Sequence, residues 1–190
     1  MTIDHGQALV APRTVALIGV SNDPKKLTAR PLQFCKQHKF SGKIYLVNPL
    51  RRQVQGQTAF PSVTSIPERV DHAYIMLGTE MVEAAMYDCI AAGVAVISIL
   101  ADGFADAGAA GREREATLVA KANGAGVMMI GPNSMGVANT ENGFICTTNA
   151  AFKTKNLRHG RLAVLSHSGS LIGALLSRGE ARSIGFSKLI

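Results

Sequence analysis

Short apolar runs alternate along this chain with longer amphipathic segments. Continuous apolar runs of this length are typical of strands buried on both faces of a sheet. Strands and helices that alternate through short connections are typical of βαβ units and a parallel sheet. The pattern therefore predicts a Rossmann-like α/β fold with helices on both faces of the sheet. Its strands are expected at residues 14–20, 43–47, 72–77, 94–100 and 127–130, and its helices at residues 26–39, 81–92 and 112–123.

Residues with strong positional preferences mark the ends of the expected helices. Pro31 fits the first turn of a helix, and Glu80 and Glu83 place acids where the helix dipole favours them. Gly93 and Gly124 follow two helical patterns and are expected to close them. Residues 60–63 (FPSV) are expected to be extended or to form a turn.

A second unit begins late in the chain. Residues 149–160 are polar, basic and unpatterned, which is typical of a linker. A strand is expected at residues 161–165, a turn at 166–170, a helix from 171 to 177 and another strand at 186–190. About 30 residues cannot bury a core of their own. We therefore expect a Rossmann-type domain over residues 1–148, a linker over 149–160, and the truncated start of another domain over 161–190.

Composition excludes several classes of protein. Apolar residues make up 47% of the 190 residues and charged residues 17%, which indicates a folded chain with a sizeable core. No apolar run reaches the roughly 18 residues of a membrane span, and residues 1–13 do not resemble a signal peptide. Cys35, Cys89 and Cys146 are too dispersed for a metal or disulfide pattern, so a reducing cytoplasm is expected. The chain has no Trp and only 5% aromatic residues, which argues against stacking platforms for single-stranded nucleic acid.

The net charge of +7 is unevenly distributed. Residues 25–67 contain no acid, and a one-sided basic region indicates an anionic partner. Nucleic acid and a polyphosphate cofactor are both candidates at this stage. The basic residues of this region are Lys25, Lys26, Arg30, Lys36, Lys39, Lys43, Arg51 and Arg52.

The loops that follow the strands are where such folds bind ligands. The first loop has Gly19, then Ser21 and Pro24, so two glycines of the dinucleotide fingerprint are missing and NAD is disfavoured. A NAD site also needs an acid at the end of the second strand, but here Asn48-Pro49 is followed by Leu50 and two arginines. Arginine is suited to phosphate, which favours a phosphorylated ribose. NADP and coenzyme A (CoA) both carry one.

The third and fourth loops discriminate only weakly between NADP and CoA. Leu77-Gly78 and Asp102-Gly103 each offer a glycine where a ligand could approach the backbone. Neither loop carries a base or a nucleophile in a redox arrangement, and none of the five loops contains the His that hydride transfer to a carbonyl often uses.

Seven segments, in order, give the chain a specific resemblance. It resembles the CoA-binding domain of the NDP-forming acyl-CoA synthetases, and is alpha-subunit-like within the succinyl-CoA synthetase superfamily. The resemblance covers residues 13–190 and implies a Rossmann-type domain followed by the start of a flavodoxin-like domain. The matching segments are VALIGVSNDP (15–24), Lys26-Leu27 with Arg30, GKIYLVNP (42–49), ADGF (101–104), IGPNSMG (130–136), RLAVLSHSGSLIGALL (161–176) and IGFSKL (184–189).

The resemblance implies roles for particular residues of the first domain. The pyrophosphate of CoA would contact Gly19, Val20 and Ser21, and the coenzyme site would also include Asn22 and Arg30. The adenosine 3′-phosphate would lie by Asn48, Pro49 and Arg51. The family usually has its basic residue directly after Asn-Pro, whereas here Leu50 intervenes. The adenine and pantetheine path would be lined by Leu77, Gly78, Asp102, Gly103 and Phe104. Ser134 replaces a cysteine that is common in the family.

The resemblance also implies a phosphate site in the second unit. Ser168, Gly169 and Ser170 would hold the phosphate of a phosphohistidine at a helix N-terminus. His167 matches an earlier motif than the one that carries the phosphohistidine, so that histidine is expected beyond Ile190. The turn at 166–170 is not a hydrolase elbow, because Ser166 stands where G-x-S-x-G needs glycine. No catalytic residue and no metal ligand is therefore expected within the chain.

The implied parent enzyme converts acid, CoA and NTP into acyl-CoA, NDP and phosphate through an acyl phosphate and a phosphohistidine. The chain itself would bind CoA without turnover. Mg²⁺ and ATP or ADP would bind outside it, on an ATP-grasp domain or subunit, in a cytoplasmic oligomer that binds neither nucleic acid nor membrane. Two alternatives remain: an NAD(P)-binding oxidoreductase or redox-sensor module, and a CoA-sensing regulatory domain of a protein acetyltransferase. The acyl group and the nucleotide stay open.

Overall fold

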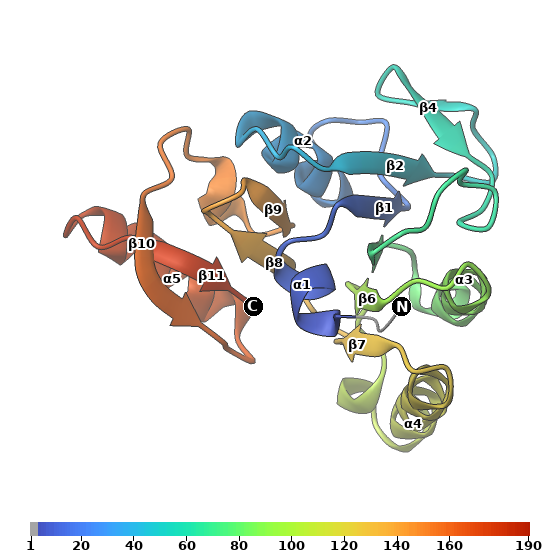
Figure 1. Ribbon diagram of the computed structural model, residues 1–190. Coiled ribbons are helices and arrows are strands. Elements are labelled where there is room, and N and C mark those ends of the chain that lie inside the picture. Colours follow the sequence, from blue (N-terminus) through green and yellow to red (C-terminus); the bar gives the residue numbers. More distant parts are fainter. Residues whose placement is uncertain (1–3) are drawn as a thin grey trace.

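A seven-stranded sheet forms the larger part of the computed structural model, which describes residues 4–190 (Figure 1). Every pair of neighbouring strands is parallel except β3 and β4. The predicted Rossmann-like fold is confirmed. In their order across the sheet the strands are β3 (Gln53–Val54), β4 (Gln57–Phe60), β2 (Lys43–Val47), β1 (Thr14–Ile18), β5 (His72–Ile75), β6 (Val96–Ile99) and β7 (Met128–Ile130).

The central strand β1 shows why the sheet is covered on both faces. Its side chains alternate between the two faces, and all five residues are buried. Ala16 and Ile18 belong to a core closed by α3 (Thr79–Ala91) and α4 (Ala109–Gly124). Val15 and Leu17 belong to a second core, on the side of α2 (Arg30–Gln37). A continuous apolar strand is stable here because neither face meets water.

Pro31, Glu80 and Gly93 lie at helix ends as predicted, whereas Glu83 lies beyond the first turn of α3 and Gly124 lies inside α4. Pro31 lies in the first turn of α2, and Gly93 follows α3 in the left-handed region with φ +70°. Gly124, however, does not close its helix, because α4 includes it. The left-handed residue is Gly126, with φ +67°. The helix α1 (His5–Val10) and the 3-10 turn η2 (Ala105–Ala107) were not predicted, and the first residues of the predicted helix 26–39 form the 3-10 turn η1 (Leu27–Ala29).

A smaller sheet with the strand order β10-β11-β8-β9 lies beside the larger one. Its strands are β8 (Gly136–Asn139), β9 (Phe144–Thr147), β10 (His159–Val164) and β11 (Phe186–Leu189). β8 and β9 were not predicted, and β11 pairs antiparallel with β8. Between β9 and β10 the segment 149–160 contains the 3-10 turn η3 (Ala150–Lys153), whose Phe152 is buried. α5 (Gly169–Glu180) packs against this sheet.

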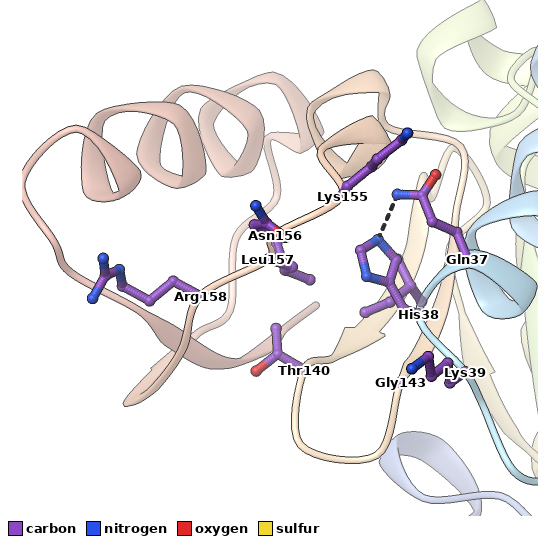
Figure 2. A pocket seen from close by; sticks show the side chains of 10 residues that line it. Gln37, His38, Lys39, Thr140, Gly143, Lys155, Asn156, Leu157 and Arg158 are labelled. Atoms are coloured by element: carbon purple, nitrogen blue, oxygen red, sulfur yellow. Dashed lines mark hydrogen bonds between the residues drawn. The ribbon is translucent and has the colours of Figure 1, made fainter.

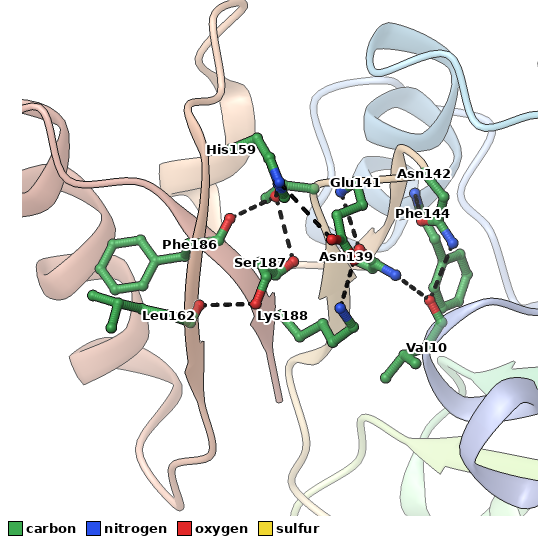
Figure 3. Close-up of polar contacts among 11 residues, drawn as sticks. Val10, Asn139, Glu141, Asn142, Phe144, His159, Leu162, Phe186, Ser187 and Lys188 are labelled. Carbon is green, nitrogen blue, oxygen red and sulfur yellow. Dashed lines mark hydrogen bonds and ion pairs between the residues drawn. The ribbon is translucent and has the colours of Figure 1, made fainter.

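Residues 159–190 are tied to the preceding chain by polar contacts, which Figure 3 shows, and by an apolar cluster. Lys188 Nζ lies 2.6 Å from a Glu141 carboxylate oxygen, and His159 Nε2 lies 3.9 Å from the other. This lysine is the main reason that the pKa of Glu141 lies below its usual value. Beneath these contacts, Phe34 of α2 shares an apolar cluster with Ile172 and Phe186. The β8–β9 hairpin therefore links the two sheets.

Residues 4–190 contain neither a candidate membrane span nor a candidate metal cluster. None of their helices is long and apolar enough to cross a membrane. Within the same residues, no three His, Cys, Asp or Glu side chains gather in a way that could hold a metal ion.

Candidate functional site

The loops at the carboxyl ends of the parallel strands lie side by side and are joined by hydrogen bonds. The Gly19 N–H after β1 donates to Val47 O at the end of β2, at 3.3 Å. The Thr79 hydroxyl after β5 donates to Asp102 O after β6, at 2.9 Å. The Asn133 N–H after β7 donates to Ala101 O, at 2.8 Å. Most of the residues assigned to the coenzyme thus lie along one edge of the sheet.

Gly19 lies where the strand order changes direction. The chain leaves β1 for β2 on one side and later returns to β5 on the other, and ligands bind at such a switch point. Gly19 has φ +88°, and an added Cβ would lie 2.7 Å from both Met76 O and Leu77 Cδ2. Only glycine fits at this position, so no side chain covers the backbone of residue 19. A phosphate can approach such a backbone closely, which a dinucleotide or CoA site requires.

The loop after β2 has the geometry expected from its sequence. Asn48 Oδ1 accepts a hydrogen bond from the Leu50 N–H at 3.0 Å, which forms an Asx turn. Leu50, Arg51 and Arg52 follow this turn and are exposed. Neither arginine forms an ion pair with an acid in the described part of the chain. Both guanidinium groups are therefore free to pair with a phosphate.

The loop after β6 offers few donors to an anion. The Asp106 carboxylate accepts the Gly103 and Phe104 N–H groups at 3.3 and 2.8 Å, and these bonds lower its pKa. A Glu115 oxygen accepts the next N–H, from Ala105, at 3.0 Å. Because its amides are engaged by the protein's own carboxylates, this loop suits an uncharged part of a ligand better than a phosphate.

Two residues assigned to the coenzyme from the sequence make contacts within the protein. The Phe104 side chain is 2% exposed and packs in the core with α3 and α4. It anchors its loop, and only its backbone could face a ligand. Arg30 donates from Nη1 to Thr148 O at 2.7 Å, so part of its guanidinium joins α2 to the end of β9. Val20 is also buried, whereas Ser21, Gly78 and Asp102 are accessible.

The loop after β7 meets the start of α5 in a cleft of about 530 Å³. Gly131, Asn133 and Ser134 line one side, and Ser166, His167 and Gly169 line the other. A Cβ on Gly169 would lie 2.3 Å from Met135 Sδ, so the two segments are in contact. The assigned phosphate turn is therefore continuous with the row of strand-end loops and not separate from it.

The turn at Ser168 has the structure of an N-capped helix start. Ser168 Oγ accepts the Leu171 N–H at 3.2 Å, and Ser166 Oγ accepts the Ser168 N–H at 3.0 Å. The Gly169 and Ser170 N–H groups make no hydrogen bond within the described residues. These two amides at the positive end of the α5 dipole are what the turn can offer an anion.

Gln55 contacts the loop after β1, and sequence reasoning did not predict this contact. It lies at the tip of the β3–β4 hairpin, and its backbone N–H donates to Asn22 Oδ1 at 2.8 Å. Its side-chain amide donates to Ser21 O, also at 2.8 Å. The hairpin thus touches the loop after β1. No local pattern indicates this, because the partners are more than 30 residues apart in sequence.

A second cleft, of about 550 Å³, lies at the C-terminal end of α2 (Figure 2). Lys39, Lys155 and Arg158 lie on its rim, while Gln37 and His38 bond to the carbonyls of the η3 segment. In Figure 2 Lys155 and Arg158 extend away from one another, so they do not converge on one ligand. This cleft is remote from the strand-end loops and contains none of the assigned residues.

Gly19, which has no side chain, lies at the switch point after β1, and Arg51 and Arg52 lie in the loop after β2. Together they define a Rossmann-type domain suited to a nucleotide with a phosphorylated ribose. A family model described as "CoA binding domain" matches residues 13–140. The chain belongs to this CoA-binding domain family.

Known relatives agree with this assignment. The chain is 37% identical over 179 residues to the alpha subunit of the ADP-forming acetate–CoA ligase II of Pyrococcus furiosus, covering 94% of this chain and 38% of the relative. It is 36% identical over 184 residues to the ADP-forming acetate–CoA ligase I of Archaeoglobus fulgidus, covering 97% and 26%.

A solved structure is similar throughout the chain. It is the dinucleotide forming acetyl-coenzyme A synthetase 1 of Ca. Korarchaeum cryptofilum in complex with phosphate and ADP. The TM-score is 0.89 at 28% identity, covering 100% of this chain and 39% of the other. The chain therefore spans about a quarter to two fifths of the length of these relatives.

Proposed function

We propose that this chain is the CoA-binding part of an NDP-forming acyl-CoA synthetase, which joins a carboxylic acid to CoA at the expense of an NTP. The match of the CoA-binding family over residues 13–140 carries the proposal. The relatives named as ADP-forming acetate–CoA ligases supply the reaction class. Neither alternative, an NAD(P) oxidoreductase or an acetyltransferase regulator, is favoured by a specific observation.

The residues present fit CoA. The bare backbone at Gly19, where a Cβ has no room, would receive the pyrophosphate together with Ser21 and Asn22. Arg51, with Arg52 beside it, would pair with the 3′-phosphate by charge-assisted hydrogen bonds. The loops at Gly78 and Gly103 would line the uncharged path of the adenine and pantetheine. CoA supplies the thiol that becomes acylated, and the residues of this chain bind and orient it.

The cleft between Ser134 and Gly169 would lie at the far end of this row of loops. We propose that the free amides of Gly169 and Ser170, with the Ser168 hydroxyl, hold a phosphoryl group there. The phosphohistidine, Mg²⁺ and the ATP or ADP site would belong to the rest of the whole protein, on an ATP-grasp domain or subunit. An oligomeric state and a cytoplasmic location are part of the same proposal.

Ligand preference is the first test. CoA is expected to bind most tightly, dephospho-CoA and NADP more weakly, and NAD not measurably. Loss of one charge-assisted phosphate contact costs about 1.5–3 kcal/mol, or roughly 10- to 150-fold in affinity. Isothermal titration calorimetry with the four ligands measures this order. Tighter binding of NADP than of CoA would contradict the proposal.

Substitutions of Arg51 and Arg52 test which of the two residues contacts the 3′-phosphate of CoA. Arg51→Ala should reduce the CoA affinity toward that of dephospho-CoA and leave the affinity for dephospho-CoA unchanged. Arg178→Ala, at another exposed arginine, on α5, serves as the matched control and should alter neither affinity. If Arg52→Ala has the larger effect, the 3′-phosphate lies one residue further along the loop than proposed.

Phosphoryl transfer is the second test. Because the phosphohistidine is proposed to lie outside this chain, incubation of the chain with γ-³²P-ATP and Mg²⁺ should leave it unlabelled. Acid-labile label that disappears in His167→Ala would show instead that His167 carries the phosphoryl group. His159→Ala is the matched control, since His159 is also exposed and is held by Thr140 and Glu141.

A further inference from the structure

The β3–β4 hairpin has an unusual residue at its tip. Val54 pairs with Gln57, so Gln55 and Gly56 form a two-residue turn, and both have positive φ, 49° and 74°. These angles are those of a type I′ turn, in which asparagine is strongly preferred at the first position. Glutamine has no such preference, and a residue held in a sparsely populated conformation often marks a functional site.

The two hydrogen bonds of Gln55 explain why a glutamine occupies this turn position. The backbone N–H could reach Asn22 Oδ1 whichever side chain Gln55 carried. The bond to Ser21 O, in contrast, needs the Gln55 side-chain amide. An asparagine amide is one methylene shorter and would fall short of this carbonyl at the same backbone position. Glutamine is therefore suited to the contact and unfavourable for the turn.

The first of these bonds also orients Asn22. Because Asn22 Oδ1 faces the Gln55 N–H, the amide nitrogen of Asn22 is left as a donor, and it makes no hydrogen bond within the described residues. Ser21 is restrained in addition by its own Oγ, which accepts the Asp23 N–H at 3.1 Å. The hairpin and this turn together fix the two polar residues that follow Gly19.

We propose that Gln55 is a positioning residue for the coenzyme: it braces the loop 19–22 against the β3–β4 hairpin so that the loop is preorganised for the pyrophosphate. The inference rests on the proposed CoA-binding function and deepens it. Arg51 and Arg52 lie directly before β3, so the same hairpin joins the 3′-phosphate loop to the pyrophosphate loop. The two phosphate-binding loops are thereby held at a fixed separation.

The substitution Gln55→Asn separates positioning from folding. Asparagine improves the I′ turn, so the melting temperature should stay unchanged or rise, whereas the loss of the Ser21 contact should weaken CoA binding roughly three- to tenfold. Dephospho-CoA should be weakened by the same factor, because Gln55 acts on the pyrophosphate loop. Gln53→Asn, on the exposed side of the same hairpin, is the control and should change neither affinity.

Each outcome of titration calorimetry and thermal unfolding decides the proposal. Weaker binding of both ligands at an unchanged or higher melting temperature supports it. Wild-type affinity in Gln55→Asn overturns it, as does a loss of affinity that follows a loss of stability, since Gln55 would then be only structural. A selective loss for CoA over dephospho-CoA would also overturn it. Titration of the wild-type chain with CoA is the control for the proposed function. If the wild-type chain does not bind CoA, the proposed function itself is overturned, whatever the variant does.

Discussion

Gly19→Ala is expected to abolish most CoA binding and to lower the free energy of unfolding by about 3 kcal/mol. The alanine Cβ would lie 2.7 Å from Met76 O, a backbone atom that cannot move without disturbing β5. The residue also has φ +88°, which an L side chain rarely adopts. The loop must therefore shift, and the backbone proposed to contact the pyrophosphate shifts with it. Denaturant unfolding and calorimetric titration measure the two effects.

Gly93→Ala is the matched control. Gly93 has a similar φ of +70°, but a Cβ there would meet nothing within 4 Å. It should lose only about 1 kcal/mol of stability, from backbone strain, and keep its CoA affinity. A CoA affinity in Gly19→Ala that equals that of Gly93→Ala would mean that the loop after β1 does not contact the coenzyme.

The sequence predicted those elements whose own apolar runs are long enough to indicate burial. β1, β5 and β6 are mostly apolar and are buried on both faces, so their local composition indicates them. β8 and β9 are different, because their polar residues Asn139 and Thr147 are buried only once the hairpin packs. Pairing with β11, some 50 residues later, completes their sheet. No local pattern carries that information.

The candidate site, too, has residues that local sequence indicates and residues whose contacts depend on distant parts of the chain. Gly19 and the arginine loop follow from the residue types at strand ends, and the structure explains why Gly19 must be glycine. Gln55 could not be found, because its role depends on a contact with Ser21 across two loops. Phe104 shows the same limit, since its side chain turns into the core although it directly follows the accessible loop residues Asp102 and Gly103. Local sequence indicates which loops follow the strands, but not which of their side chains turn outward and which turn into the core.

Acidification should destabilise the fold through His72. This histidine of β5 is fully buried, its Nε2 lies 2.8 Å from Ser98 Oγ, and its ring lies 5.5 Å from that of Phe144. Burial disfavours the charged imidazolium and lowers the pKa of His72 from 6.5 to about 4. The unfolded chain therefore takes up a proton below pH 6.5 that the folded chain refuses until about pH 4. Stability is complete above pH 6.5 and falls by about 3 kcal/mol as the pH approaches 4.

Unfolding by urea at a series of pH values between 7.5 and 4 tests this expectation. His72→Gln retains an amide that can bond to Ser98 but cannot titrate, so its loss of stability on acidification should be about 3 kcal/mol smaller than that of the wild type. The free energy of unfolding of His72→Gln at pH 7.5 need not equal that of the wild type, because the test compares only the change with pH. Ser98→Ala is the control, because it removes the hydrogen-bond partner while the imidazole stays buried, and it should keep the full acid dependence. Parallel pH profiles for His72→Gln and the wild type would mean that His72 is protonated in the folded chain as readily as in the unfolded one.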